Sequence, residues 1–284
     1  MLEQITEIKQ RLARIEAQLA GLVGSNTIYL GDHEALTRLY TGHRIYLDTR
    51  DVGIASHIML EGRWEPWVET TIAQLVKPGM HVVDAGANFG YYTLLMAQWV
   101  GAGGRVDSFE ANPSICQKLR KSIAVNGFSG HVRLHEVAVM DREGTAEFTF
   151  THEFSGGGAV GAGRDAHWTN ETTTVTVKPM DSVLADVPRV DFIKLDVEGG
   201  EPAALRGAME LIGRSPSLAM IVEFHAPAFA RAGDPADAFL QRWEGMGFRI
   251  SLVEPDCVSP ALPAAEIARL AGNRLTYLQL VRGG

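Results

Sequence analysis

Short apolar runs that favour strands alternate with segments of helical periodicity from about Trp64 to the end of the chain. Such alternation is typical of βαβ units and a parallel sheet. The expected strands are residues 81–84, 105–110, 132–137, 191–196, 219–225, 249–253 and 275–281, and the expected helices are residues 91–100, 114–125, 201–212 and 235–246. We therefore predict an α/β fold with a doubly wound, mostly parallel seven-stranded sheet.

The alternation of strand-like and helical segments is interrupted between about Thr145 and Val177. Within the runs TAEFTF and TTTVTV, residue types alternate along the chain in the pattern that is typical of antiparallel strands. The segment between them, residues 155–168, contains five glycines and has the composition of a closing lid. We predict an inserted β-hairpin with a glycine-rich tip.

The first 24 residues carry apolar side chains at alternating spacings of three and four. These are Ile5, Ile8, Leu12, Ile15, Leu19 and Leu22. The repeat favours an N-terminal coiled-coil helix and a homo-oligomer, and an amphipathic helix packed on its own domain is the alternative. The predicted organisation is a coiled-coil helix over 1–24, a β-rich pre-domain segment over 25–64 and the main domain over 65–284.

Composition excludes several classes of protein. The net charge of −8 repels phosphate backbones and no basic patch offsets it, so we expect no nucleic-acid partner. Two isolated cysteines, Cys116 and Cys257, favour a reducing compartment. The first residues lack the apolar run of a secretion signal, and no stretch approaches the roughly 20 apolar residues of a membrane span. We expect a cytoplasmic protein.

A glycine loop follows the first predicted strand in the stretch VVDAGANFGYYT. Gly86 and Gly90 allow the backbone to turn sharply and to approach a ligand closely. A dinucleotide would place its pyrophosphate on this loop, where Asp84 would repel it. S-adenosylmethionine instead carries an ammonium and a sulfonium group, which Asp84 would attract. The loop therefore favours S-adenosylmethionine over a nicotinamide cofactor, and no G-x-G-x-x-G follows the first strand.

The second predicted strand ends in Glu110, 20 residues beyond Gly90. A carboxylate at this place can accept both hydroxyls of a ribose, although an acid can also simply end a strand at the surface. Topology places Ala138 along the adenine edge of such a ligand. Tyr91 opens the helix after the loop and is a candidate to cover the methionine moiety.

Five stretches of the chain together resemble the FkbM-type methyltransferases, namely GRWEPW, VVDAGANFGYYT, FEANP, DFIKLDVEGGE and IVEFH. The resemblance covers about residues 40–281 and implies a class I, Rossmann-like methyltransferase that methylates a hydroxyl, commonly on a sugar or a polyketide-derived product. It also implies that the loop and Glu110 hold the cofactor and that Glu65 lies near the same pocket. The full expected cofactor-binding set is Glu65, Asp84, Gly86, Asn88, Gly90, Tyr91, Glu110, Ala111, Asn112, Ala138 and Asp196.

Methyl transfer to oxygen requires the acceptor to lose its proton, so the site needs a base or a metal. Strand alternation places Lys194 and Asp196 on one face of the fourth strand and Glu223 and His225 on one face of the fifth. His225 is the first candidate for the base, and Lys194 is the second if burial lowers its pKa. Asp196, Glu223 and His225 would instead suit a divalent metal such as Mg²⁺, or the group could be a structural network.

The leading hypothesis is an S-adenosylmethionine-dependent O-methyltransferase whose acceptor is a small molecule or a glycan. An N-methyltransferase is the second hypothesis, because nitrogen needs only a base after transfer. The third is a non-catalytic coiled-coil assembly protein with a vestigial cofactor pocket. Absence of S-adenosylmethionine binding would contradict both enzymatic hypotheses.

Overall fold

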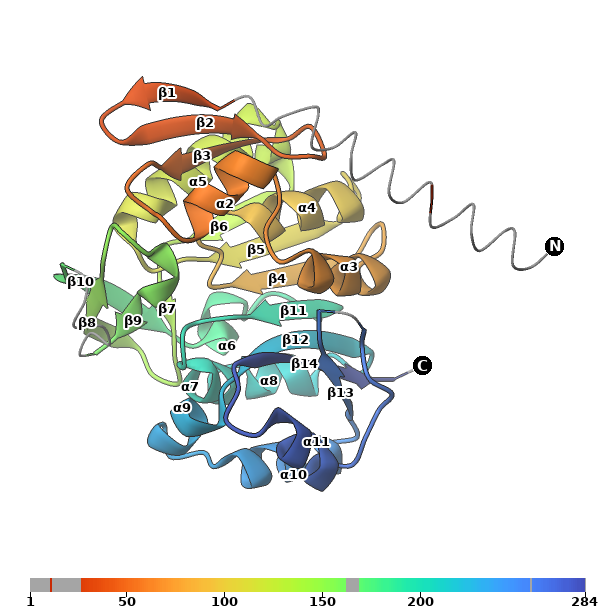
Figure 1. Ribbon diagram of the computed structural model, residues 1–284. Helices are drawn as coiled ribbons and strands as arrows, with labels where there is room; N and C mark the ends of the chain where they lie inside the picture. Colours follow the sequence, from red (N-terminus) through yellow and green to blue (C-terminus); the bar gives the residue numbers. More distant parts are fainter. Residues whose placement is uncertain (1–10, 12–26, 162–168, 256, 284) are drawn as a thin grey trace.

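A seven-stranded sheet forms the centre of the protein in a computed structural model that describes residues 11, 27–161, 169–255 and 257–283. Its strands are β4 His81–Ala85, β5 Arg105–Phe109, β6 Val132–His135, β11 Phe192–Leu195, β12 Leu218–Phe224, β13 Arg249–Val253 and β14 Thr276–Arg282. Their order is β13-β14-β12-β11-β4-β5-β6 (Figure 1). Strand β14 is antiparallel to both of its neighbours, and the other pairings are parallel. The predicted mostly parallel sheet is confirmed.

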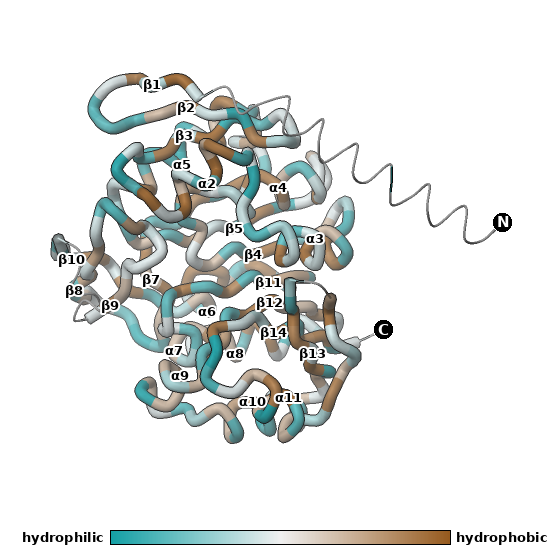
Figure 2. Tube along the Cα trace, viewed as in Figure 1, coloured by the Kyte–Doolittle hydropathy of each residue, from teal (hydrophilic) through white to brown (hydrophobic). Residues whose placement is uncertain are grey.

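Helices cover both faces of the sheet, which gives three layers (Figure 1). In β4, Val82 and Val83 belong to hydrophobic clusters on opposite faces, because successive side chains of a strand point to opposite sides. The face with Val82 carries α2 Ile54–Glu61, α3 Pro66–Leu75, α4 Tyr91–Val100 and α5 Pro113–Val125. The face with Val83 carries α6 Met180–Val183, α7 Glu201–Arg206, α8 Met209–Gly213, α9 Ala226–Arg231, α10 Ala236–Gly245 and α11 Ala264–Ala271. Burial on both sides explains the hydrophobic colour along the central strands in Figure 2.

The predicted helix over 201–212 is divided into α7 and α8. A Cβ on Gly207 would lie 2.0 Å from the carbonyl oxygen of Met140, so the chain passes another backbone at this point. The amides of Glu210 and Leu211 then donate to the carboxylate of Asp181 at 3.0 and 2.7 Å. The second helix therefore starts from a cap of its own, which periodicity alone does not reveal.

A second sheet is inserted between β6 and β11. Its strands are β7 Ala138–Val139, β8 Gly144–Phe150, β9 Ala159–Val160 and β10 Glu171–Lys178, in the order β7-β10-β8-β9. Strands β8 and β10 pair antiparallel, which confirms the predicted hairpin. The expected strand 132–137 is shorter than predicted, because the chain leaves the central sheet after His135 and β7 pairs with β10. Residues 162–168 of the predicted lid lie outside the described residues.

A three-stranded antiparallel sheet precedes the main fold and packs on α5. It consists of β1 Ile28–Gly31, β2 Glu34–Arg38 and β3 Arg44–Asp48. The amide of Tyr46 donates to Ser122 Oγ at 2.9 Å. The predicted coiled coil falls outside the described residues apart from residue 11, so it stays a prediction, as do the boundaries at 24 and 64. No described helix combines the length and the hydropathy that crossing a bilayer requires.

A buried ion cluster joins the three parallel strands β4, β5 and β6. The carboxylate of Asp107 in β5 is fully buried and contacts His81 Nε2 at 2.6 Å, His135 Nε2 at 2.7 Å and Arg105 Nε at 3.0 Å. Burial by itself would raise the pKa of Asp107, but the hydrogen bonds from His135 and His81 and the charge of Arg105 hold it well below its usual range.

We predict that Asp107→Asn lowers the free energy of unfolding at pH 7 by about 3 kcal/mol, because it breaks a buried ion cluster. A carboxyl whose folded pKa is lowered contributes stability above its unfolded pKa of about 3.9, and the contribution is lost as pH falls through the folded value. Urea unfolding at several pH values would test this. The variant should lose less stability than the parent between pH 6 and pH 3, whereas the exposed control Asp237→Asn should follow the parent. Equal acid sensitivity of variant and parent would contradict the assignment.

Candidate active site

Two adjoining cavities lie at the carboxyl edge of the central sheet. The larger has a volume of about 320 Å³ and lies between the loop after β4 and the inserted sheet. The smaller, of about 50 Å³, lies between the same loop and helices α2 and α4. Both are lined by Gly86, Asn88, Gly156 and Glu198. The carboxyl edge is the usual ligand-binding edge of a doubly wound fold.

The loop after β4 reaches this edge through three residues with left-handed backbones. These are Gly86, Asn88 and Gly90, with φ of 81°, 50° and 96°. A Cβ on Gly86 would lie 1.7 Å from the carbonyl oxygen of Asp196, and one on Gly90 would lie 2.3 Å from Leu119 Cδ1. Both predicted glycines are therefore needed for close packing as well as for the turn. Gly90 lines neither cavity; it caps the start of α4.

Glu110 lies in the wall of the larger cavity, as the sequence predicts. Its two carboxylate oxygens accept hydrogen bonds from the amides of Asn88 and Asn112, each at 2.8 Å. Burial raises the pKa of Glu110, and these two amides oppose the shift. Each oxygen retains further acceptor capacity for a ligand hydroxyl. The predicted residues Ala111, Asn112 and Ala138 line the same cavity.

The sequence analysis expects Asp84 to face the cationic groups of the ligand, and the structure does not place it at either cavity. Its side chain is fully buried behind the loop and lines neither cavity, so it does not contact a ligand there directly. One oxygen accepts from Thr93 Oγ1 at 2.6 Å, and the other has no partner. Burial raises the pKa of Asp84, and the charge of Lys194 opposes that shift. Asp84 therefore influences the site through its charge and through Lys194.

Lys194 and Asp196 meet at the smaller cavity, which both line. Lys194 Nζ lies 3.0 Å from Asp196 Oδ2 and 4.7 Å from the ring centroid of Tyr92. Burial alone would lower the pKa of Lys194, but the charges of Asp196 and Asp84 raise it overall. The condition under which Lys194 was a candidate base, a pKa lowered by burial, is not met, and a lysine that stays protonated does not act as a general base.

Glu65 is held behind the smaller cavity by two tyrosines. The hydroxyl of Tyr92 lies 3.0 Å from its carboxylate, and the hydroxyl of Tyr277 lies 3.1 Å from it and 3.0 Å from Asp196 Oδ2. Burial and the charge of Asp196 raise the pKa of Glu65 to about 7. Glu65 itself lines neither cavity. This predicted cofactor residue contacts Tyr92, which does line the smaller cavity. The predicted Tyr91 does line the smaller cavity.

Sequence reasoning missed Tyr277, which joins Glu65 to Asp196. Tyr277 follows the first residue of β14 and pairs in register with Glu223 near the end of β12. Because β14 is antiparallel, its beginning lies at the edge where the parallel strands end. A polar aromatic at the start of the last strand was the signal, and it is informative only once the direction of that strand is known.

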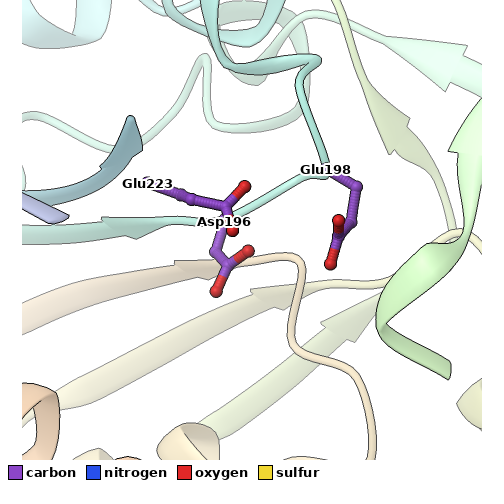
Figure 3. A group of neighbouring side chains, drawn as sticks. All are labelled: Asp196, Glu198 and Glu223. Carbon is purple, nitrogen blue, oxygen red and sulfur yellow. The ribbon is translucent and has the colours of Figure 1, made fainter. Parts of the chain in front are cut away.

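The predicted metal ligands are brought together only in part. Asp196, Glu198 and Glu223 each offer a carboxylate oxygen, and these oxygens lie within 4.8 Å of one another (Figure 3). His225 is not in this group and lines neither cavity, which also removes it from the predicted position of the base. Strand β12 ends at Phe224 and His225 is the N-cap residue of α9, so His225 lies where the chain leaves the sheet.

A buried aspartate, Asp51, connects the segment between β8 and β9 of the inserted sheet to the start of α2. The two oxygens of Asp51 accept from the amides of Gly53 and Ala55 at the start of α2 and from the amide of Ser155 at 2.7 Å. The amide of Val52 also donates to Glu153. The described beginning of the predicted lid is thus tied to the segment before α2.

A doubly wound sheet with a glycine loop after β4 and a buried acid after β5 is an arrangement that binds nucleotide cofactors, and the family comparison assigns it to the class of S-adenosylmethionine-dependent methyltransferases. The family model described as "Methyltransferase FkbM domain" matches residues 84–250, which is more than half of the chain. The chain belongs to the FkbM methyltransferase family.

Two curated relatives and one solved structure illustrate the similarity. Methyltransferase 1 of Beauveria bassiana is 27% identical over 203 residues, covering 64% of this chain and 77% of that protein. Protein-L-isoaspartate O-methyltransferase of Aeropyrum pernix is 37% identical over 78 residues, covering 27% of this chain and only 29% of that protein. A SAM-dependent methyltransferase from Aquifex aeolicus aligns with a TM-score of 0.42 at 14% identity, covering 80% of this chain and 92% of that chain.

We predict that Gly86→Ala destabilises the protein far more than Gly79→Ala. The two glycines have nearly the same φ, 81° and 82°, but a Cβ on Gly79 would meet nothing within 4 Å. The left-handed backbone should cost about 1 kcal/mol at Gly79. At Gly86 the contact with Asp196 should raise the cost to about 4 kcal/mol. Urea unfolding of both variants measures the difference, and similar losses would show that the close approach is not needed.

Proposed function

We propose that the protein is an S-adenosylmethionine-dependent O-methyltransferase that methylates a hydroxyl of a small molecule or a glycan. The observation that carries the proposal is the smaller cavity, where carboxylates of Asp196 and Glu198 face the same space as the loop residues Gly86 and Asn88. A carboxylate beside the loop gives a hydroxyl a place to lose its proton.

The larger cavity fits the cofactor's nucleoside in size and chemistry. Its volume of about 320 Å³ is within the usual range for ligand sites. Glu110 offers its remaining acceptor capacity to ribose hydroxyls, and the wall formed by Val137, Ala138 and Phe148 is apolar, as a stacked base requires. When bound, S-adenosylmethionine supplies a methyl group on a positively charged sulfonium.

The charge around the smaller cavity favours a cationic ligand. Asp196 and Glu198 line it, and Asp84 and Glu65 lie behind it, whereas Lys194 supplies positive charge. The charge of Lys194 is already engaged by Asp196 at 3.0 Å. Carboxylates that are partly removed from water favour a ligand that brings a positive group beside them. The preference that the sequence argument assigned to Asp84 is thus proposed for the group as a whole.

Asp196 is the residue that we propose to act on the acceptor. It lines the cavity, and Lys194 and Tyr277 fix its Oδ2 by contacts of 3.0 Å each, which leaves Oδ1 for the acceptor. Asp196 would either take the proton or hold a divalent cation such as Mg²⁺ that lowers the pKa of the hydroxyl. The aromatic wall of Trp64 and Phe89 would pack on the apolar face of the acceptor.

Methyl transfer tests the function directly. We expect transfer of a labelled methyl group from S-adenosylmethionine to a member of a panel of hydroxyl compounds, with matched amines as the comparison. Asp196→Asn should lower kcat by about 100-fold or more, because the group that accepts the proton is lost. Transfer to amines alone would refute the assignment to oxygen, and undiminished turnover in the variant would refute the role of Asp196.

Calorimetric titration tests the cofactor site separately. Glu110→Gln should weaken S-adenosylmethionine binding by about 3 kcal/mol, or about 100-fold, since the amide also deprives one backbone N–H of its acceptor. The exposed control Glu147→Gln on β8 should bind like the parent. Unchanged affinity in the Glu110 variant would place the ribose elsewhere.

We also propose that the chain is cytoplasmic and self-associates through the heptad positions between Ile5 and Leu22. Light scattering during size-exclusion chromatography should give an oligomer for the full chain and a monomer when Leu12 and Leu19 are both replaced by Asp. A monomeric parent would refute this proposal.

A further inference from the structure

Glu65 has a backbone conformation that is costly for any residue other than glycine. It is the N-cap residue of α3, with φ of 40° and ψ of 68°, which lies in the left-handed region. Strain of this kind persists only where the surrounding structure holds it, and it is frequent at active sites. Glu65 nevertheless lines neither cavity, so its contacts must explain the strain.

Two tyrosines hold the carboxylate of Glu65. The hydroxyl of Tyr92 lies 3.0 Å from its Oε2, and the hydroxyl of Tyr277 lies 3.2 and 3.1 Å from its two oxygens. Both tyrosines are buried in the hydrophobic cluster on the Val82 face of the sheet, so packing fixes their rings. The left-handed backbone at Glu65 thus places its carboxylate where two fixed hydroxyl groups converge.

Tyr277 connects Glu65 to the wall of the smaller cavity. Its hydroxyl also lies 3.0 Å from Oδ2 of Asp196, which lines that cavity. The hydroxyl can donate its one proton to Asp196 without leaving Glu65 unpaired, because Tyr92 donates to Glu65. Lys194 Nζ contacts the same Oδ2 at 3.0 Å. Two donors from different strands therefore meet at one oxygen of Asp196, and the other oxygen stays available to the methyl acceptor.

We propose that Glu65 is a positioning residue that acts on Asp196 through Tyr277, and that it is not a ligand of the cofactor. Glu65 fixes the Tyr277 hydroxyl, and that hydroxyl together with Lys194 fixes the carboxylate of Asp196 so that Oδ1 faces the methyl acceptor. This inference rests on the proposed methyltransferase function. It replaces the cofactor-binding role that the sequence analysis expects for Glu65.

Three variants of the full-length protein test the proposal. Glu65→Ala removes the partner of both tyrosines, Tyr277→Phe removes one hydroxyl, and Glu65→Gln keeps polar atoms that can pair with both tyrosines. Glu65→Ala and Tyr277→Phe should each lower kcat about 10-fold, with KM for the methyl acceptor little changed, because the orientation of Asp196 is lost. Glu65→Gln should lose less than Glu65→Ala. Calorimetry should give all three variants the parent's affinity for S-adenosylmethionine.

A double variant distinguishes a connected pair from two separate effects. Because Glu65 acts through Tyr277, Glu65→Ala combined with Tyr277→Phe should lower kcat about 10-fold, whereas independent effects would multiply to about 100-fold. The matched control Tyr29→Phe, at an exposed tyrosine of β1, should keep the parent's kcat. Thermal unfolding checks that each variant is folded, and Glu65→Met replaces Glu65→Ala if that variant is not.

Weaker S-adenosylmethionine binding by both Glu65→Ala and Glu65→Gln would overturn the proposal in favour of direct contact with the cofactor. Unchanged kcat in Tyr277→Phe, or a loss of about 100-fold in the double variant, would overturn it as well. If the parent methylates amines only, the assignment to oxygen fails, and the same comparison made with the amine still decides the role of Glu65.

A parent that methylates nothing would refute the proposed function, and crystal structures of the parent and Glu65→Ala would then decide the role of Glu65. Loss of the 3.0 Å contact between Tyr277 and Asp196 in the variant would support positioning, and its retention would overturn it.

Discussion

The contact between the backbones of Gly86 and Asp196 is the constraint on which the site depends. A Cβ on Gly86 would lie 1.7 Å from the Asp196 carbonyl, so the loops after β4 and β11 touch without any side chain between them. The amides of Gly86 and Ala87 both donate to the carbonyl of Phe109, at 3.0 and 2.9 Å. The ends of three adjacent strands are thereby fixed together, and Glu110, Asn88 and Asp196 are fixed relative to one another.

The two cavities differ in how they would select a ligand. The larger cavity has largely apolar walls and is lined by two acids, Glu110 and Glu198, of which Glu110 already accepts backbone hydrogen bonds through both of its oxygens. The smaller cavity is lined by the carboxylates of Asp196 and Glu198 and by the buried Lys194, beside aromatic side chains. Shape and hydrogen bonding therefore dominate in the first and charge in the second, which is the division that a nucleoside joined to a cationic methyl donor requires.

Of the cofactor residues expected from sequence, members of the loop and the acid after the second strand lie at the wall of the larger cavity, and their role in binding a cofactor stays a prediction. Gly86, Asn88 and Glu110 all line the larger cavity, because their positions follow from local backbone geometry and from the edge at which parallel strands end. Asp84 and Glu65 were predicted at the same site but lie behind its walls. Periodicity gives the face of a strand on which a side chain lies, but it does not give the depth of that side chain.

The sequence by itself determined the seven strands of the central sheet, the inserted hairpin, the family and the residues of the glycine loop. These features depend on local periodicity, on the conformational freedom of glycine and on short motifs. Only the tertiary structure decided that Tyr277 joins Glu65 to Asp196 and that Glu198, not His225, stands beside Glu223. Those contacts depend on the direction of the last strand, on where β12 ends and on the turn after β11, and all three are set by packing between segments that are distant in the chain.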